Sequence, residues 1–203
     1  MPGVVRDVLS ACRSAPVIHH MLAGSPRRRQ AEDFVRQTFA QSYGARISAF
    51  APNLMQIERD GSTVAVAGWR SAGDERLFLE CYLDVPVNVA VARLAGHPVR
   101  RSRIAEVGNL ASARSGGSIN VILALARHLD QLGFEWVVFT ATQELIGIFR
   151  KLGLSLLALA PADPARLPEP ADDWGSYYDN APVVVAGRIR LALEHSQKYG
   201  CVA

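Results

Sequence analysis

A glutamate inside an apolar stretch is the residue whose type and position most suggest chemistry. Glu106 lies in the run Ile104-Ala-Glu-Val-Gly-Asn-Leu-Ala, which is short and typical of a β-strand. Burying a carboxylate is costly unless the group is paired or used, and burial raises its pKa, which suits a general base. The alternative is a buried ion pair with an arginine such as Arg70 or Arg103. Both roles are open from the sequence.

A glycine turn follows this strand and leads into a helix. The turn reads Arg114-Ser-Gly-Gly-Ser, and Ser118 is a natural N-cap for the helical apolar spacing that continues to Gly133. A strand, a glycine turn and a helix N-terminus together favour an anion, because backbone N–H groups are exposed and the helix dipole adds partial positive charge. This arrangement suits the phosphates of a nucleotide-type cofactor. An ordinary strand-to-helix connection is the alternative.

Composition limits the class of protein. The 203 residues are 49% hydrophobic and 20% charged with a net charge of +3, which is ordinary for a soluble globular chain. No lysine tract or interleaving of aromatic and basic residues suggests nucleic acid, and no apolar run approaches a membrane span. Three widely spaced cysteines and the lack of a secretory signal predict a cytoplasmic location. We expect one domain over residues 27–198, an appendage over 1–26 and a tail over 199–203.

Hydrophobic periodicity predicts several strands, then alternating strands and helices, which is a mixed α/β pattern. The predicted helices span residues 28–43, 87–94, 119–132, 143–152 and 187–197, and a short helix over 4–12 is open. The predicted strands span residues 47–50, 54–59, 63–70, 77–83, 103–112, 135–142, 154–160 and 182–186. Asp60-Gly61 between two of these strands predicts a hairpin turn.

This order of elements resembles the GCN5-related N-acetyltransferase (GNAT) superfamily. In that fold the fourth strand lines the acyl-cofactor cleft and runs into a phosphate-binding turn, and the fifth strand splays away to leave a V-shaped gap for the pantetheine arm. The matching residues here are Ile104 to Ala111 and Arg114-Ser-Gly-Gly-Ser-Ile, with an echo in Phe149-Arg-Lys-Leu-Gly-Leu. Two positions depart from the superfamily pattern. Ile119 replaces a small residue of the turn, and Phe149 replaces a frequent catalytic tyrosine.

A closer resemblance is to the thermostable hemolysin family, itself similar to GNAT proteins and acyl-homoserine-lactone synthases. It covers roughly residues 30 to 190. The segments that carry it begin at Leu79 (Leu-Glu-Cys-Tyr-Leu-Asp-Val-Pro-Val), Glu106 (Glu-Val-Gly-Asn-Leu-Ala-Ser), Trp136 (Trp-Val-Val-Phe-Thr-Ala-Thr), Leu159 (Leu-Ala-Pro-Ala-Asp-Pro-Ala-Arg-Leu) and Trp174 (Trp-Gly-Ser-Tyr-Tyr-Asp). It implies an α+β fold with a GNAT-like, mainly antiparallel central sheet flanked by helices, and a V-shaped splay between the fourth and fifth strands.

The fold so implied predicts acyl transfer from acyl-CoA, or from acyl-phosphopantetheine on an acyl carrier protein, to a small amine. The family name implies a membrane-active hemolysin instead, and a third alternative is a GNAT-like protein that binds an acyl ligand without turnover. No metal is expected, because no carboxylate or cysteine lies at ligand spacing from His19-His20.

The resemblance also implies roles for individual residues. Glu106 would be the base, and the Tyr177 phenol would act as an acid, although such tyrosines more often only pack. Backbone N–H groups near Asn109 and Leu110 would hold the thioester oxygen, or Asn109 would instead hydrogen-bond the substrate. Glu80 and Asp84 would bind a cationic amine, with a hydrogen-bonded strand edge as the alternative. The expected donor-binding residues are Val107, Gly108, Leu110, Arg114, Gly116, Gly117 and Ser118, and Thr140 and Thr142 are expected to line the cleft.

Two arginine clusters are relevant to the identity of the acyl donor. They comprise Arg27 to Arg29, and Arg100, Arg101 and Arg103. Exposed arginines favour encounter with an acidic protein. Because Ile119 leaves the pyrophosphate turn incomplete, we expect acyl carrier protein to be a better donor than coenzyme A, docking through Arg100 and Arg101.

Overall fold

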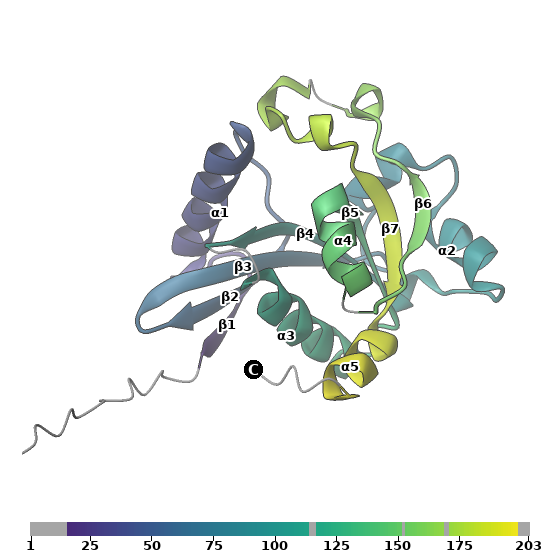
Figure 1. The fold of residues 1–203 in the computed structure, drawn as a ribbon, viewed down its shortest axis with the longest axis horizontal. Coiled ribbons are helices and arrows are strands. Elements are labelled where there is room, and N and C mark those ends of the chain that lie inside the picture. Colours follow the sequence, from purple (N-terminus) through teal and green to yellow (C-terminus); the bar gives the residue numbers. More distant parts are fainter. Residues whose placement is uncertain (1–15, 114–116, 152, 169–170, 199–203) are drawn as a thin grey trace, which may run out of the picture.

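A central sheet organises the chain, and a computed structural model describes residues 16–113, 117–151, 153–168 and 171–198. Its order is β1-β2-β3-β4-β5-β7-β6 (Figure 1). The strands are β1 (Val17–Met21), β2 (Asn53–Arg59), β3 (Ser62–Ser71), β4 (Ile104–Ser112), β5 (Trp136–Ala141), β6 (Leu157–Pro161) and β7 (Val183–Arg188). Every neighbouring pair is antiparallel except β4 and β5, which are parallel. The expected mainly antiparallel sheet is confirmed.

Helices cover both faces of the sheet because successive strand residues point to opposite sides. On one face, Leu54 and Val66 pack under α1 (Arg28–Tyr43), and Val138 packs under α2 (Val87–Ala95). On the other face, Met55 packs against α3 and Phe139 against α4. That second face carries α3 (Gly117–Gln131), α4 (Gln143–Lys151) and α5 (Ile189–Lys198). None of the helices in the described ranges combines the length and the apolar character needed to cross a membrane.

The two parallel strands separate after a short pairing, as expected. The register joins Ile104 to Trp136, Ala105 to Val137 and Glu106 to Val138, and in the described chain it goes no further. Strand β5 continues to pair with β7 up to Ala141. The sheet therefore splits into two arms from Val107 onward. The expected V-shaped splay between the fourth and fifth strands is present.

A bulge in β4 changes which side chains share a face. Asn109 has a positive φ of 49°, and the register with β3 shifts where Gly68 pairs with Gly108. As a result, Leu110 packs with Val107 against α3. Strict alternation along residues 104–112 would predict Leu110 on the face of Glu106, and this prediction is wrong because the extra bulge residue reverses the order.

Two predicted strands are absent from the described structure. Residues 77–83 form the 3₁₀ helix η1 (Phe78–Tyr82), and residues 47–50 are irregular. The irregular segment is held through side chains, since Arg28 donates to the carbonyls of Ala51 and Pro52. The possible helix over 4–12 lies outside the described residues, and β1 lies within the range assigned to an appendage.

Other elements that were predicted from caps and turn residues form where the sequence places them. Helix α1 spans the predicted 28–43 and ends at Gly44, whose φ is 67°. The hairpin between β2 and β3 turns at Asp60 and Gly61, which have φ values of 52° and 73°. Both residues adopt the left-handed conformation that a tight hairpin turn requires. Strand β6 is displaced, however, because it begins at Leu157 rather than at 154.

Candidate active site

Glu106 lies at the last paired position before β4 and β5 separate, and its carboxylate is buried. Its Oε2 accepts the backbone N–H of Phe78 at 2.9 Å, and its Oε1 accepts that of Leu79 at 2.9 Å. Arg70 Nε lies 3.4 Å from Oε2, so the ion pair considered as an alternative is present. Burial raises the pKa of Glu106, while the two N–H groups and Arg70 oppose that rise. A carboxylate offers about four acceptor positions, and one on Oε1 accepts no hydrogen bond from the described residues, so a ligand could use it.

Two cavities meet at Glu106. We call the first, of 240 Å³, the aromatic cleft, because Phe39, Tyr43, Phe78, Tyr82, Phe139, Trp174, Tyr177 and Tyr178 contribute to its lining. The second, of 320 Å³, is the outer cavity, and its charged lining residues are Arg46, Arg70, Glu106 and Asp173. Both cavities share Phe78, Glu106, Gly108, Asn109 and Trp174. Among the described residues Glu106 is therefore the one carboxylate common to both.

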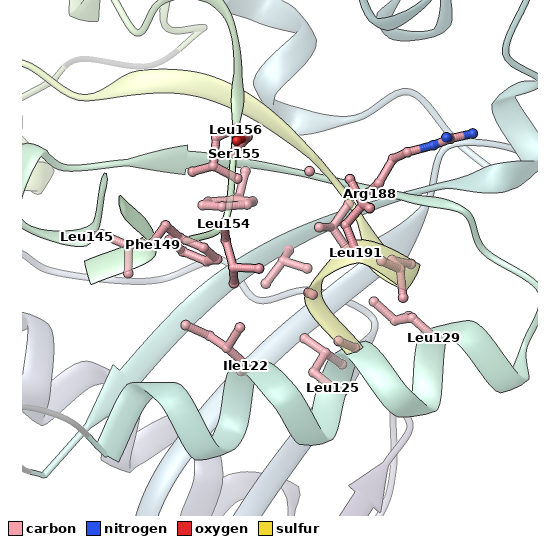
Figure 2. Close-up of a pocket in the computed structure, with 18 of the residues that line it drawn as sticks. Ile122, Leu125, Leu129, Leu145, Phe149, Leu154, Ser155, Leu156, Arg188 and Leu191 are labelled. Carbon is pink, nitrogen blue, oxygen red and sulfur yellow. The ribbon is translucent and has the colours of Figure 1, made fainter. Parts of the chain in front are cut away.

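A third cavity lies on the opposite face of the sheet, between α3, α4 and α5. We call this 420 Å³ space the apolar cavity. Figure 2 shows Ile122 and Leu125 of α3 pointing into it toward Phe149 and Leu154, while the Arg188 guanidinium points away. It shares Val107, Leu110, Phe139 and Leu145 with the aromatic cleft. Because Val107 and Leu110 lie on β4 and Phe139 on β5, the two spaces adjoin at the split between these strands.

Asn109 fixes one wall of the site through its side chain. Its Oδ1 accepts the N–H of Ala51 at 2.9 Å, and its Nδ2 donates to the carbonyl of Ala49 at 3.4 Å. Gly68 makes room for this contact, since a Cβ there would lie 2.9 Å from Oδ1. The side chain expected to hold a substrate is thus engaged with the irregular segment. Its backbone at the bulge still lines both cavities.

Tyr177 is the centre of an aromatic cluster that closes the aromatic cleft. Its ring lies 5.3 Å from that of Tyr43 and 5.6 Å from that of Trp174, and its hydroxyl donates to the Thr140 carbonyl at 3.4 Å. Burial raises the pKa of Tyr177, so the phenol stays protonated at neutral pH. The neighbouring Tyr178 hydroxyl lies 2.5 Å from that of Tyr82.

A comparison with known proteins decides the family. The sequence pattern of the family described as "Thermostable hemolysin" matches residues 21–193. The chain belongs to this family. No curated protein matches the sequence significantly.

Solved structures show the fold of this hemolysin-family chain. The acyl-homoserine-lactone synthase LasI is 13% identical with a TM-score of 0.60, over 89% of this chain and 95% of that one. FeeM, an N-acyl amino acid synthase from uncultured soil microbes, is 14% identical with a TM-score of 0.58, over 94% and 99%. The CoA-dependent synthase BjaI, solved with SAM and isopentyl-CoA, is 14% identical with a TM-score of 0.57, over 92% and 90%. At such identities the likeness shows an acyl-homoserine-lactone synthase-like fold.

The remaining donor-site candidates are only partly visible in this hemolysin-family chain. Arg114 and Gly116 lie outside the described residues. Helix α3 begins at Gly117, so Ser118 lies in its first turn and not at the N-cap position predicted from the sequence. Thr140 and Thr142 line the aromatic cleft, and the Thr142 hydroxyl accepts the N–H of Leu145 at 3.4 Å. Among the described residues, no three His, Cys, Asp or Glu side chains gather to hold a metal, and its expected absence stays a prediction.

Glu80 and Asp84 lie away from Glu106, in a separate cavity. The strand predicted over 77–83 would put Glu80 and Asp84 on one face, and this prediction is wrong because residues 78–82 form a 3₁₀ helix. Glu80 is buried and accepts the N–H groups of Leu77 and Val87 at 2.9 Å each. Arg101 also binds it, with Nη1 2.5 Å from Oε1. Asp84 is exposed and pairs with Arg166 at 2.9 Å.

The arginine clusters are largely committed to internal contacts. Arg101 donates to Glu80 and to the carbonyls of Ala72 and Glu75. Arg103 donates to the carbonyl of Gly133. Arg28 holds the irregular segment, as described above, and Arg27 pairs with Glu58. The expectation that Arg101 belongs to a free docking surface is therefore wrong, because charge alone does not show whether an arginine is already paired.

Arg101→Met is expected to destabilise the fold by about 3 kcal/mol, because it leaves the buried Glu80 carboxylate without its cation. The contacts of Glu80 lower its pKa from 4.5 to about 2. A depressed folded pKa stabilises the protein above the unfolded pKa, and this contribution is lost as pH falls through 2. The parent should therefore lose up to about 3 kcal/mol between roughly pH 5 and pH 2, and Arg101→Met should lose less.

Chemical denaturation at several pH values measures this effect. Arg100→Met is the matched control, since Arg100 is exposed and adjacent. Similar stability losses in both variants would show that the Glu80 contact contributes little.

Residues 173–176, which we call the strap, cross the end of α1 and hold the aromatic cluster around Tyr177 in place. Ser176 donates its N–H to the Tyr43 carbonyl at 2.8 Å, and Arg46 donates its N–H to the Asp173 carbonyl at 2.6 Å. In Figure 1 this yellow-green segment crosses from β6 and β7 toward the end of α1. Gly175 permits the approach, with a φ of 52° and an ideal Cβ position only 2.0 Å from the Tyr43 carbonyl oxygen.

Gly175→Ala is expected to displace the strap and to lower the melting temperature. Left-handed backbone alone costs a non-glycine residue about 1–3 kcal/mol, and the collision with Tyr43 adds to it. Gly24→Ala is the matched control, because Gly24 has a φ of 83° but nothing within 4 Å of its Cβ position. Thermal unfolding of both variants measures the difference, and equal losses would mean that the strap adapts without cost.

Proposed function

We propose that this protein transfers an acyl group from a thioester of coenzyme A or acyl carrier protein to a small amine. The observation that carries the proposal is the split between β4 and β5, where a carboxylate-bearing cleft adjoins a separate apolar cavity. The fold shared with acyl-homoserine-lactone and N-acyl amino acid synthases supports the same reaction class.

The split and two of the cavities would accommodate the three parts of such a reaction. The pantetheine arm would lie in the split, where β4 lacks a ladder partner on its β5 side in the described chain. The acyl chain would enter the apolar cavity, whose lining is mostly aliphatic and aromatic. The acceptor would enter through the outer cavity and meet the thioester at Glu106 and Gly108. Donor and acceptor therefore approach the reacting carbon from different sides.

Glu106 is the base in this proposal. The acceptor nitrogen forms a bond to the thioester carbonyl carbon as the carbon–sulfur bond breaks. The free position on Glu106 Oε1 takes the proton that the nitrogen loses, directly or through one water, and this proton ends on the leaving sulfur. Burial raises the pKa of Glu106 and so makes it a stronger base than an exposed glutamate.

Backbone N–H groups and a phenol would stabilise the charge that develops on the thioester oxygen and on the leaving sulfur. Backbone N–H groups between Val107 and Leu110 that face away from β3, beyond the last β5 pairing, would donate to the thioester oxygen. The raised pKa of Tyr177 makes it a poor proton source, but its hydroxyl keeps its hydrogen and could exchange the 3.4 Å bond to the Thr140 carbonyl for one to a bound thioester. We therefore assign Tyr177 a hydrogen bond to the leaving sulfur rather than a proton transfer.

A thiol-release assay tests the proposal. Acyl-CoA and acyl carrier protein thioesters of increasing chain length would be incubated with a pooled panel of small amines, and acylated products identified by mass spectrometry. We expect thiol release that depends on the acceptor. Binding of a thioester without release would favour a non-catalytic acyl-binding protein. Leakage from liposomes without any thioester would favour the membrane activity that the family name implies.

A further inference from the structure

The outer cavity has a lining whose charges cancel. Two guanidinium groups and two carboxylates line it as ion pairs, Arg70 with Glu106 at 3.4 Å and Arg46 with Asp173 at 3.2 Å. Apolar residues complete the wall, namely Ile47, Phe78, Leu167, Pro168 and Trp174. This combination of paired charges and an apolar wall indicates which class of acceptor fits.

Within the described part of the chain, the contacts of Arg70 leave guanidinium donors for a ligand. Its contacts with Glu106 and Glu75 measure 3.4 and 3.8 Å, whereas charge-assisted hydrogen bonds to carboxylates are about 2.7–2.9 Å long. A guanidinium carries five N–H donors in a planar fork that suits a bidentate carboxylate. The side chain of Arg70 is only 22% exposed, so solvent screens a carboxylate bound there less than at the surface.

An apolar contact surface lies beside this pair. Phe78 is 38% exposed although its own N–H is bound by Glu106, and its ring lies 6.0 Å from that of Trp174. Both rings line the outer cavity as well as the aromatic cleft. A ligand held at Arg70 and Glu106 can therefore place an apolar group against aromatic rings.

We propose that the acceptor is a free α-amino acid with an apolar or aromatic side chain, an assignment that rests on the proposed acyl transfer. Its carboxylate binds Arg70, its amine faces Glu106, and its side chain lies against Phe78 and Trp174. Arg70 and Glu106 are close enough for one substrate to bridge them, because a single carbon separates the amine from the carboxylate in an α-amino acid. A simple cationic amine carries no carboxylate for the guanidinium to bind and would be repelled by its positive charge.

Matched acceptor pairs test this assignment. Leucine would be compared with 3-methylbutylamine, and phenylalanine with phenethylamine, each with the same acyl thioester and with the acylated product measured. The kcat/KM for the amino acid should exceed that for its decarboxylated partner by about 10- to 100-fold, the usual value of one hydrogen bond to a charged group. Arg70→Gln should remove most of this preference. Arg93→Gln is the control, because Arg93 is exposed on α2 and lines none of the three cavities.

The outcomes separate this inference from the proposed function. If the parent protein acylates the amines as well as the amino acids, the inference is overturned while acyl transfer stands. The same holds if Arg70→Gln slows both members of a pair equally, since the preference would then not arise at Arg70. Glycine acylated as well as phenylalanine would overturn the apolar side-chain contact. Absence of thiol release with every acceptor would overturn the proposed function itself.

Discussion

Replacing Glu106 by glutamine is expected to lower kcat/KM by about 100- to 10,000-fold, the usual effect of losing a general base. Glutamine has nearly the same shape but cannot take a proton. It also brings an N–H group to the backbone donors of Phe78 and Leu79, both of which Glu106 now accepts. One of these donors would lose its partner, at a cost of about 1–3 kcal/mol in stability. Activity and thermal unfolding should therefore be measured on the same preparation, at a temperature where the variant is folded.

The pH dependence of kcat/KM separates catalysis from structure. If Glu106 is the base, activity falls as pH drops through its raised pKa, because the protonated carboxyl cannot accept a proton. The Arg70 cation lowers the pKa of Glu106, so Arg70→Met should raise that pKa and move the acid limb to higher pH. The quantity to compare is the pH at which kcat/KM falls, because the maximum value of kcat/KM also reflects acceptor binding. An unmoved limb, together with a Glu106→Gln variant of normal activity, would leave Glu106 a purely structural role.

Ile122→Trp is expected to shorten the acyl chains that the protein accepts. Ile122 points into the apolar cavity from α3 (Figure 2), and a tryptophan there fills space next to the split between β4 and β5. Each excluded methylene loses about 0.8 kcal/mol of burial, so exclusion of four costs about 3 kcal/mol, or more than 100-fold in kcat/KM. Acetyl transfer, which needs no cavity, should be nearly unchanged.

Leu132→Trp provides the matched control for this substitution. Leu132 follows α3 directly, is 52% exposed and does not line the apolar cavity, so the added bulk enters solvent. A series of thioesters from acetyl upward measures the chain-length profile of both variants. If Ile122→Trp lowers acetyl and long-chain transfer by the same factor, the acyl chain does not enter this cavity.

The elements with local signals could be predicted from the sequence. Helix α1, the turn at Asp60-Gly61 and the order from β4 to α3 each depend on periodicity, caps or turn residues a few positions apart. Glu106 could also be singled out from the sequence. The free-energy cost of burying a carboxylate in an apolar strand is evident without knowing which groups bind it. The resemblance to the thermostable hemolysin family also predicted the split between β4 and β5, and the match over residues 21–193 shows that the chain belongs to this family.

Contacts between distant segments decided the rest. Residues 78–82 form a 3₁₀ helix rather than a strand because the Glu106 carboxylate, 27 and 28 positions away, binds the N–H groups of Leu79 and Phe78. The periodicity of the segment contains no sign of such a partner. The same holds for Arg101, whose charge suggested a free surface although Glu80 holds it inside the fold.

The composition of the site likewise depended on tertiary structure. Phe78 and Trp174 are far apart in the chain, and no motif links them, yet both rings line the space beside Glu106. The bulge at Asn109 moved Leu110 to the opposite face, because one residue in the left-handed conformation reverses the alternation of a strand. Sequence thus determined which residues have reactive groups, and the packing of distant segments determined which of those groups are already satisfied and which still face a cavity.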